Sequence, residues 1–378
     1  MKNVLLVTII GIFSVSSALL VKNVTYKNND SYNIFEEEKK IEQVEEVLMK
    51  TDKIYLAVNG QEKLEYTIKA SGEPELQIIY NSEDETVCAI DENAIIHAIK
   101  PGSTKINVHV NGKTASSTVI VTDLITTIPD EPDSEKELIT GKTYTQEEND
   151  LLEAILNDRV QQAGYQTRAG VVAAARFIGL EFPYRIPYFS ENGRLNTYGY
   201  TTYADGEGRY YHKGLLLHES RFAQLDKSLY GPATWGTYIY CTPSKGKRAN
   251  GFDCSGFITW IVYNGGFEPG DVGAGVSDGI PDMTDLGEKK NLKDSIQNNE
   301  LKAGDLLSGK GSDGGHIALI AGITEDKYYV AESLWVGTGY FGAIIRTYEH
   351  DKLSNHFYWH IDMDEFYGKD GNYTAYWK

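Results

Sequence analysis

The chain has 378 residues, enough for roughly two or three domains, and its hydrophobic fraction of 41% is typical of proteins with packed cores. The formal net charge of −18 argues against a nucleic-acid partner, because phosphate binding needs clustered Lys and Arg. The same charge argues against electrostatic docking on anionic lipid or anionic wall polymer. The sequence has no metal or nucleotide motif, so we expect no cofactor and no nucleotide partner.

The N-terminal segment is typical of exported proteins. Val4–Val21 form a largely apolar run after Met1-Lys2, which is long for the core of a signal peptide and short for a membrane span. We expect residues 1–22 to be either a cleaved signal peptide or an uncleaved anchor that tethers the protein to the membrane or cell surface. Ser16-Ser17-Ala18 is only a weak cleavage site, so both outcomes stay open.

Residues 23–51 are predicted to form a polar stalk with a short helix. Residues 34–50 carry Ile41, Val44 and Leu48 at helical spacing among many Glu and Lys side chains. This spacing predicts a short charged helix that serves as a spacer rather than as a site.

Residues 52–123 show short β-rich runs separated by turn signals, which predicts an all-β sandwich. Asn111-Gly112 lies between two such runs and predicts a tight hairpin. Cys88 lies within one run, and we interpret it as a small core residue.

The same stretch resembles a bacterial immunoglobulin-like domain of the second group. The resemblance rests on Asp84–Val87, Ile99–Ile106 and Ser117–Asp123. It implies an immunoglobulin-like sandwich that acts as a spacer or adhesion module at a cell surface.

Residues 124–144 are rich in Pro, Asp and Glu and are predicted to be a linker. Residues 145–378 follow as a further domain. Thr145 with Glu148 three residues later predicts a capping box that opens a helix. A second helix is expected from about Ala169 to Leu180, ending before Pro183.

Residues 190–250 are rich in Gly, Tyr and Asn and show little periodicity. We interpret them as a long loop region on the substrate side, since such loops in compact domains are usually functional or disordered. Cys241 lies within this region. With Cys88 and Cys254 the chain has three cysteines, so at least one thiol is unpaired, and a free thiol in an exported protein is a candidate reactive group.

Cys254 is the strongest candidate nucleophile. It precedes Phe257–Val262, which has apolar residues at helical spacing, and the Gly265-Gly266 pair ends the pattern. Asp253 or Ser255 can cap this helix, which places Cys254 at its N-terminus. The positive end of a helix dipole stabilises a thiolate, and the thiolate is the attacking species.

His316 is the candidate base. It follows Gly314-Gly315 and opens an apolar run that predicts a buried strand, a rigid element suited to a base. A third group should orient the imidazole, and Glu332 on the predicted return strand is the best polar candidate. Glu332 points to the same face of the sheet as His316 if the connecting turn has an odd number of residues. If that number is even, Ala331 and Ser333 point to that face instead.

Three segments together resemble the NlpC-type peptidases of bacterial cell walls. They are Gly251–Phe257 around the cysteine, Gly304-Asp305-Leu306, and Gly315–Ala318 around the histidine. Ile186–Phe189 is similar to an upstream Pro-Tyr element whose tyrosine, here Tyr188, faces the nucleophile. The resemblance covers about residues 170–362 and implies a circularly rearranged papain-like α+β fold.

The resemblance further implies hydrolysis of peptidoglycan stem peptides, usually between γ-D-glutamate and a diamino acid. Cys254 would attack the carbonyl, and His316 would take the thiol proton and return one to the leaving amine. The Cys254 backbone N–H and the Tyr188 hydroxyl would stabilise the oxyanion. Glu332 departs from the family, in which the third polar residue is usually His, Asn or Gln.

Two further classes of function stay open from the sequence. The same residues support an amidase, an acyltransferase or a transpeptidase, because the motif does not say whether water or an amine accepts the acyl group. A surface adhesin whose second domain has lost activity is the non-enzymatic alternative.

Overall fold

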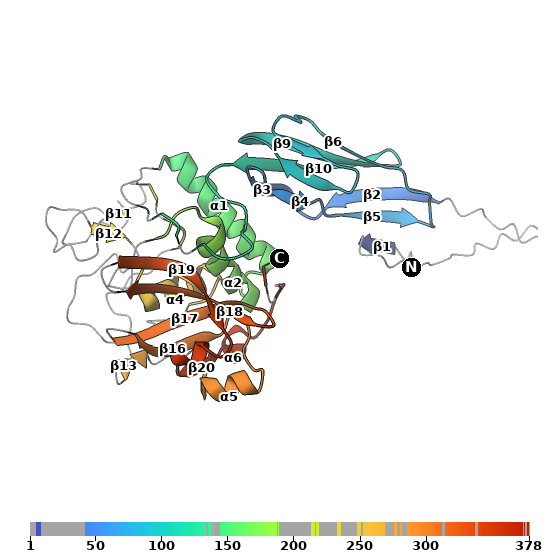
Figure 1. Ribbon diagram of the computed structural model, residues 1–378. Coiled ribbons are helices and arrows are strands. Elements are labelled where there is room, and N and C mark those ends of the chain that lie inside the picture. The colour runs from blue at the N-terminus through green and yellow to red at the C-terminus, as the bar shows by residue number, and fades with distance from the viewer. Residues whose placement is uncertain are drawn as a thin grey trace, which may run out of the picture. The chain divides into compact units, whose positions relative to one another are not determined.

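The chain forms two compact units, Met1–Asp123 and Leu124–Lys378, in a computed structural model (Figure 1). The structure describes residues 5–8, 42–133, 135–137, 139, 144–186, 188, 213–215, 217–218, 233–235, 248–250, 252–268, 276–277, 280–281, 286–311, 314–336, 339–372, 374 and 376–377. Within these ranges no helix is long and apolar enough to cross a membrane. Apart from 5–8, the expected export segment lies outside the described residues.

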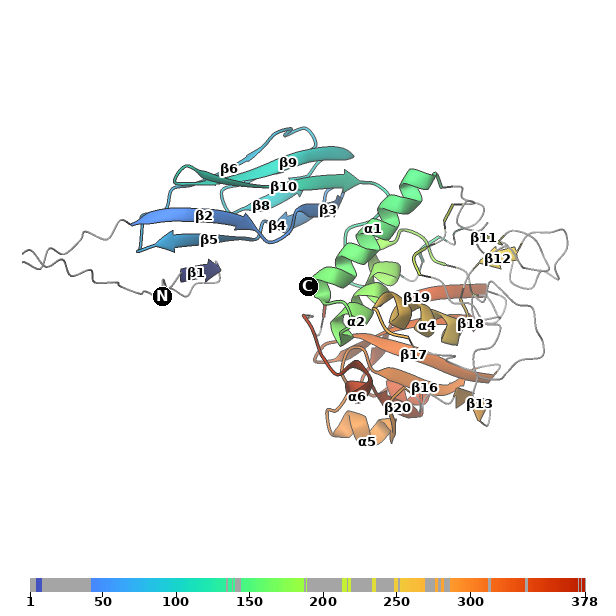
Figure 2. The same cartoon turned by 180° about the vertical axis from the view of Figure 1, so that it is seen from behind.

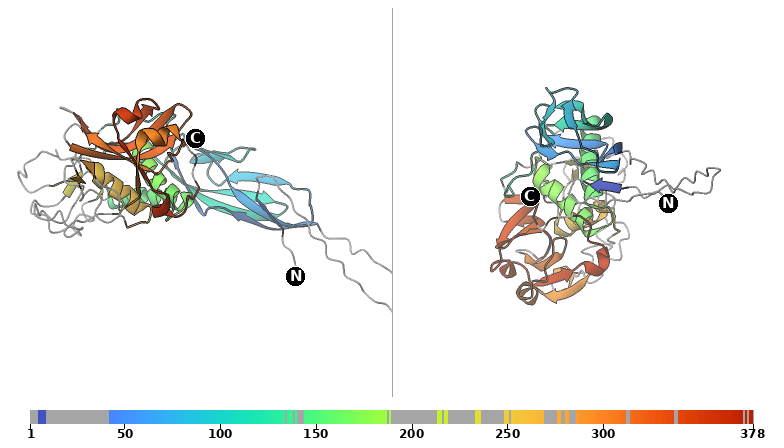
Figure 3. Two further views of the ribbon diagram at one scale, coloured as in Figure 1. Left: turned by 90° about the horizontal axis from the view of Figure 1, so that it is seen from below. Right: turned by 90° about the vertical axis from the view of Figure 1, so that its right-hand side faces the viewer.

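The first unit consists of β-strands in its described part. They are β1 (Leu5–Thr8), β2 (Gln43–Met49), β3 (Lys53–Ala57), β4 (Gln61–Lys63), β5 (Tyr66–Ser71), β6 (Ile78–Ser82), β7 (Cys88–Ile90), β8 (Ile95–Ala98), β9 (Gly102–Val110) and β10 (Lys113–Thr122). They form sheets with the orders β3-β10-β9-β6, β4-β8-β7 and β1-β5-β2. The left view of Figure 3 shows the longer strands running along this unit.

A single core joins these sheets, which confirms the expected all-β unit. Alternate residues of β5 are buried, and Ile106, Val108 and Val110 of β9 point into the same core. Cys88 is fully buried there, as expected. Asn111 and Gly112 both have positive φ, 48° and 81°, between β9 and β10, so the predicted tight hairpin is confirmed.

The helix expected near residues 34–50 is wrong over 43–49, where the chain forms β2. This strand pairs with β5, and its register shifts between Val44 and Glu46. A bulge of this kind adds one residue, so side chains three positions apart can point to the same side of a strand. Val44 and Val47 are accordingly both buried. Leu48, part of the spacing that predicted a helix, is 38% exposed, so pairing with β5 overrides that pattern.

The second unit contains both helices and strands. Its helices are α1 (Gln146–Ala163), α2 (Arg168–Arg176), the π-helix η1 (Phe177–Glu181), α4 (Cys254–Asn264), α5 (Leu292–Gln297), the 3-10 helix η3 (Leu353–Asn355) and α6 (Asp364–Tyr367). Its strands are β11 (Ala233–Trp235), β12 (Arg248–Asn250), β13 (Val276–Ser277), β14 (Ile280–Pro281), β15 (Glu288–Asn291), β16 (Leu306–Gly311), β17 (Gly314–Ile323), β18 (Lys327–Val336), β19 (Gly339–Glu349) and β20 (Trp359–Asp362).

A six-stranded antiparallel sheet organises this unit, in the order β15-β20-β16-β17-β18-β19. Helix α2 packs on both α1 and α4, and α4 packs on β17 and β18 (Figure 2). The predicted capping box is confirmed at α1, where the Thr145 hydroxyl accepts from the Glu148 N–H and the Glu148 carboxylate accepts from the Thr145 N–H. The second helix is confirmed as α2, continued by η1 and ended at Phe182.

The segment expected to be a linker, residues 124–144, belongs to the second unit and is anchored there by a few of its side chains. Ile125, Ile139 and Tyr144 are buried. The Lys136 ammonium donates to the backbone oxygens of Gly179 and Phe182, at 2.9 and 2.7 Å. The Pro and acidic residues give this segment the composition of a linker, but these few buried or hydrogen-bonded side chains attach it to the second unit.

Candidate functional site

Cys254 is the first residue of α4, and its thiol is unpaired and partly exposed. Asp253 caps the helix, with its carboxylate accepting from the Gly256 N–H at 2.8 Å. Of the two capping residues that the sequence allowed, the structure therefore selects Asp253. The Cys254 sulfur lies 4.0 Å from the Gly315 carbonyl oxygen, next to His316 on β17. Cys241, the third cysteine, lies outside the described residues.

The start of α4 is held by packing on one side and by a hydrogen bond on the other. The Phe252 ring lies 5.6 Å from both the Phe257 and the Trp260 rings, and all three side chains are buried. The buried Ser333 hydroxyl of β18 donates to the Phe252 carbonyl oxygen at 2.7 Å. Strand β18 therefore fixes the backbone two residues before the thiol.

His316 and Glu332 contact each other directly. His316 Nε2 lies 2.7 Å from Glu332 Oε2, and the two side chains are 16% and 1% exposed. Cys254 is close enough to His316 for its thiol to be among the groups that raise the pKa of the imidazole. Phe357 stacks on the imidazole with ring centroids 5.8 Å apart. The structure thus brings together the three residues that the sequence nominated.

A β-bulge decides the parity that the sequence left open. The β17–β18 ladder pairs Ile323 with Tyr328 on the turn side, and Leu319 with Ala331 beyond a register shift between Ile320 and Gly322. One step further along, Ala318 lies opposite Glu332, on the face that His316 shares. If Ala321 were paired in regular alternation instead of bulged, Ser333 would take that place.

Strand β19 adds two partners that sequence reasoning missed. The Tyr348 hydroxyl donates to Glu332 Oε1 at 2.8 Å, and Arg346 Nη1 lies 3.4 Å from the same oxygen. The Arg346 guanidinium lies over the Tyr348 ring, 5.2 Å from its centroid. Both residues sit one strand beyond Glu332, so only the β18–β19 pairing could have pointed to them.

The charges at this site are coupled. Burial works to lower the pKa of His316, but hydrogen bonds to Cys254 and Glu332 and their negative charges raise it from 6.5 to about 10. Burial works to raise the pKa of Glu332, but His316, Arg346 and Tyr348 outweigh it and lower that pKa. His316 is therefore held as an imidazolium against a carboxylate at neutral pH. In this protonated form His316 is an acid, and it can give its proton to a leaving group.

Tyr188, the expected oxyanion residue, lies beside the start of α4. Its backbone forms a parallel bridge with Phe252. The neighbouring Ile186 bridges to Ala343 on β19. The position of its hydroxyl relative to Cys254 stays a prediction. The loop residues 190–212, 219–232 and 236–247 lie outside the described residues.

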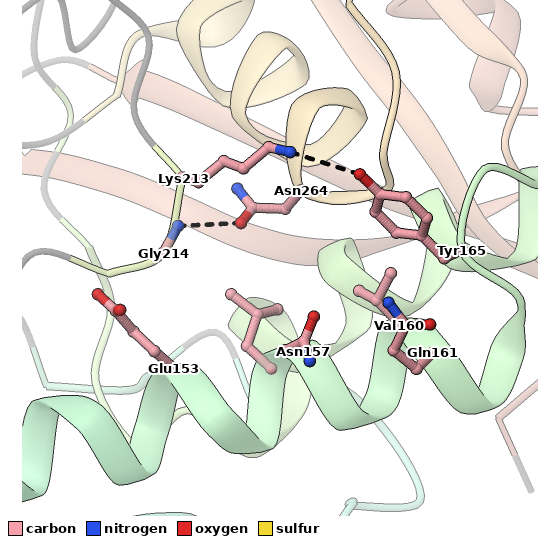
Figure 4. Close-up of a pocket in the computed structure, with 9 residues that line it drawn as sticks. Glu153, Asn157, Val160, Gln161, Tyr165, Lys213, Gly214 and Asn264 are labelled. Carbon is pink, nitrogen blue, oxygen red and sulfur yellow. Dashed lines mark hydrogen bonds between the residues drawn. The ribbon is translucent and has the colours of Figure 1, made fainter.

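A separate hollow of about 330 Å³ lies against α1 (Figure 4). Its lining is mainly polar and includes Glu153, Asn157, Gln161, Tyr165, Lys213 and Asn264. Asn264 ends the 11-residue α4 that Cys254 begins. At about 1.5 Å per residue the two ends of α4 lie roughly 15 Å apart, so this hollow is distinct from the thiol.

A second histidine lies in a similar three-residue arrangement, fully buried. His360 Nε2 lies 3.0 Å from Asp305 Oδ2, and His360 Nδ1 lies 2.9 Å from the Ser295 hydroxyl. Arg168, also fully buried, pairs with the other Asp305 oxygen at 2.6 Å. No side chain of this group is more than 1% exposed. His360 is therefore structural.

Acidic residues at the edge of this network form a group within metal-ligand distance of one another: Asp305, Asp362 and Asp364. Arg168 pairs with Asp305 and Asp364, and Lys290 pairs with Asp362 at 2.7 Å. These cations supply the charge that a metal ion would otherwise bring, so the group fits internal ion pairs.

No family model matches the sequence, and no curated protein matches it. Among solved structures, domains 4 and 5 of the S-layer protein SbsC are 13% identical over 21% of this chain and 53% of that chain, with a TM-score of 0.20. Domains 5–6 of the same protein are 10% identical over 28% and 57%, with a TM-score of 0.21. An intimin mutant of EHEC O157:H7 is 18% identical over 31% and 65%, with a TM-score of 0.16. The matches span less than two thirds of these chains, and scores of this size do not establish a common fold.

Proposed function

We propose that the protein is an exported cysteine peptidase that cleaves the stem peptides of bacterial peptidoglycan. In this proposal the second unit is an NlpC-type, papain-like α+β domain, and the scissile bond joins γ-D-glutamate to a diamino acid. The immunoglobulin-like first unit acts as a spacer from the membrane or wall, to which the N-terminal segment delivers the protein.

One observation carries the proposal: Cys254 begins a helix, its sulfur lies 4.0 Å from the backbone oxygen just before His316, and that imidazole is held by a buried carboxylate. His316 lies between Cys254 and Glu332, and it is 2.7 Å from the carboxylate. A helix N-terminus and a neighbouring imidazolium both stabilise a thiolate. A structural cysteine needs neither of them, since buried thiols pack as small apolar groups.

The reaction follows from these positions. The Cys254 sulfur attacks the peptide carbonyl carbon and forms a C–S bond while the carbonyl π electrons move to oxygen. When the tetrahedral intermediate collapses, the C–N bond breaks and His316 gives its proton to the leaving amine. Water then attacks the thioester, His316 takes one of its protons, and the sulfur leaves as thiolate. The Cys254 backbone N–H and the Tyr188 hydroxyl are the proposed oxyanion donors.

Digestion of purified peptidoglycan tests this proposal. We expect the wild-type protein to release soluble fragments, and mass spectrometry of these fragments names the bond. Cys254→Ala should reduce release by about a thousandfold or more, because removal of a nucleophile leaves only binding and oxyanion stabilisation. Cys88→Ala is the matched thiol control, since Cys88 lies in the core of the first unit, and it should digest like the wild type.

The same experiment separates the alternatives. Fragments in which an amine has replaced the leaving group would identify a transpeptidase, and cleavage at the lactyl amide would identify an amidase. Full digestion by Cys254→Ala would overturn the proposed mechanism. Absence of any digestion by the wild-type protein would favour a surface adhesin.

A further inference from the structure

We infer that Tyr348 and Arg346 are positioning residues that hold Glu332 as a carboxylate, and so keep Cys254 and His316 as a thiolate–imidazolium pair before substrate arrives. The inference rests on the proposed function of this site, because it concerns how its nucleophile is activated. It assigns a role to two residues of an edge strand that contact the reacting atoms only through Glu332.

The need for such residues follows from the burial of Glu332. Its side chain is 1% exposed, and burial alone favours the neutral, protonated form of a carboxyl group. A protonated Glu332 would leave an imidazolium at His316 without its counter-charge. The carboxylate therefore needs donors of its own in addition to His316.

Strand β19 supplies those donors on one oxygen and leaves the other oxygen for the imidazole. The Tyr348 hydroxyl, 2.8 Å away, and Arg346 Nη1, 3.4 Å away, both face Oε1. Oε2 accepts from His316 Nε2 at 2.7 Å. This division fixes the carboxylate plane and with it the ring that faces the thiol. A hydrogen bond to an ionised group is also stronger than one between neutral groups.

The titratable groups around the pair come from three elements, α4, β18 and β19. Cys254 of α4 and Glu332 of β18 face His316, and Tyr348 and Arg346 of β19 face Glu332.

His356, just after η3, lies against the Tyr348 ring with centroids 5.1 Å apart. Tyr348 is itself buried at 5% exposure, and burial together with Glu332 raises its pKa, so the hydroxyl stays a donor. Arg346 is the one permanent cation of this group and stabilises the carboxylate at every pH that the protein meets.

Alkylation of Cys254 tests the inference without any substrate. Iodoacetamide reacts with the thiolate, so its rate at each pH follows the ionised fraction of Cys254. The rate is measured on the full chain by mass spectrometry of the peptide that contains Cys254. The pH at which alkylation reaches half of its maximal rate is the midpoint of this profile. Tyr348→Phe should raise the midpoint by about one pH unit and slow alkylation near pH 6.5 by about tenfold.

Matched variants separate positioning from packing. Tyr328 pairs directly with Tyr348 across β18 and β19 and is equally buried, but its ring stacks on His350, 4.2 Å away. Tyr328→Phe should therefore keep the wild-type midpoint. Arg346→Gln should raise the midpoint and Arg346→Lys should restore it. Because Arg346 is 36% exposed at an edge strand, its variants decide the matter if Tyr348→Phe does not fold.

Unchanged midpoints in both Tyr348→Phe and Arg346→Gln would overturn the inference. An equal shift in Tyr328→Phe would also overturn it, since packing would then explain the effect. If the variants shift the midpoint as expected but the wild-type protein leaves peptidoglycan intact, the proposed substrate is refuted and the inference stands.

Discussion

Two histidines on the same sheet lie beside a carboxylate and a hydroxyl or thiol, and only His316 is accessible from solvent. His316 on β17 joins Glu332 and Cys254, whereas His360 on β20 joins Asp305 and Ser295. Strand β16 separates them in the sheet. The comparison teaches that the three residue types do not by themselves define a reactive site.

Access and the place of the nucleophile make the difference. His316 is 16% exposed and Cys254 is partly exposed, while Ser295 and His360 are buried to 1% or less. Cys254 begins α4, whereas Ser295 lies inside the six-residue α5. The Asp305 carboxylate also has a buried cation of its own in Arg168. The buried arrangement around His360 is therefore closed to solvent, its carboxylate charge is balanced by Arg168, and it contributes to stability.

The largest expected effects come from exchanging each histidine for alanine. His316→Ala should lower peptidoglycan digestion by about a thousandfold or more, because it removes the only proposed acid and base. His360→Ala should instead lower the free energy of unfolding by about 3 kcal/mol, since it leaves buried partners unsatisfied. Urea unfolding and digestion assays, both corrected to folded protein, measure the two effects. Equal loss of activity in both variants would remove the distinction.

A smaller effect is expected for Glu332→Gln, which removes the charge and keeps the shape. The Glu332 carboxylate contributes to raising the pKa of His316 to about 10, so its removal lowers that pKa. The imidazolium persists only below its pKa, so the alkaline limb of the activity profile should move to lower pH. Activity near pH 8 should fall by about tenfold to a hundredfold. A variant whose alkaline limb coincides with that of the wild type would contradict this role of the carboxylate.

The smallest effect is expected for Ser295→Ala in the buried arrangement. It removes one neutral hydrogen bond to His360 Nδ1, which should cost about 1–2 kcal/mol in the free energy of unfolding. Thermal or urea unfolding measures this cost. Digestion per folded molecule should match the wild type, and a specific loss of activity would mean that the inner network reaches the reactive site.

The parts of the fold that could be predicted from sequence are those that depend on neighbours in the chain. The caps at Thr145 and Asp253 and the hairpin at Asn111-Gly112 are local, and the structure has them where expected. Cys254 and His316 could be nominated for the same reason, since each stands at the start of a local pattern. Their contact required only that a helix start and a strand start meet.

The failures all depend on contacts between distant segments. Strand β2 was expected as a helix because Ile41, Val44 and Leu48 have helical spacing, which carries no sign of the pairing with β5. The supposed linker of residues 124–144 packs through a few buried side chains, among them Ile139. Tyr348 and Arg346 reach Glu332 only through the pairing of β18 with β19. Local patterns carry no information on partners of this kind.

The bulge at Ala321 restricts how this part of the chain can change in length. Because Ala321 is left unpaired, Glu332 rather than Ser333 lies on the His316 side of β18. With this bulge kept, a change of one residue in the turn between Ile323 and Tyr328 would turn β18 over, exchanging its carboxylate for a hydroxyl at the imidazole and breaking the Ser333 bond to Phe252. A change of two residues in that turn would restore both faces. Loss of Ala321 itself would remove the bulge and keep Glu332 beside His316, so the turn tolerates changes of even length, whereas the bulge tolerates loss of its one extra residue.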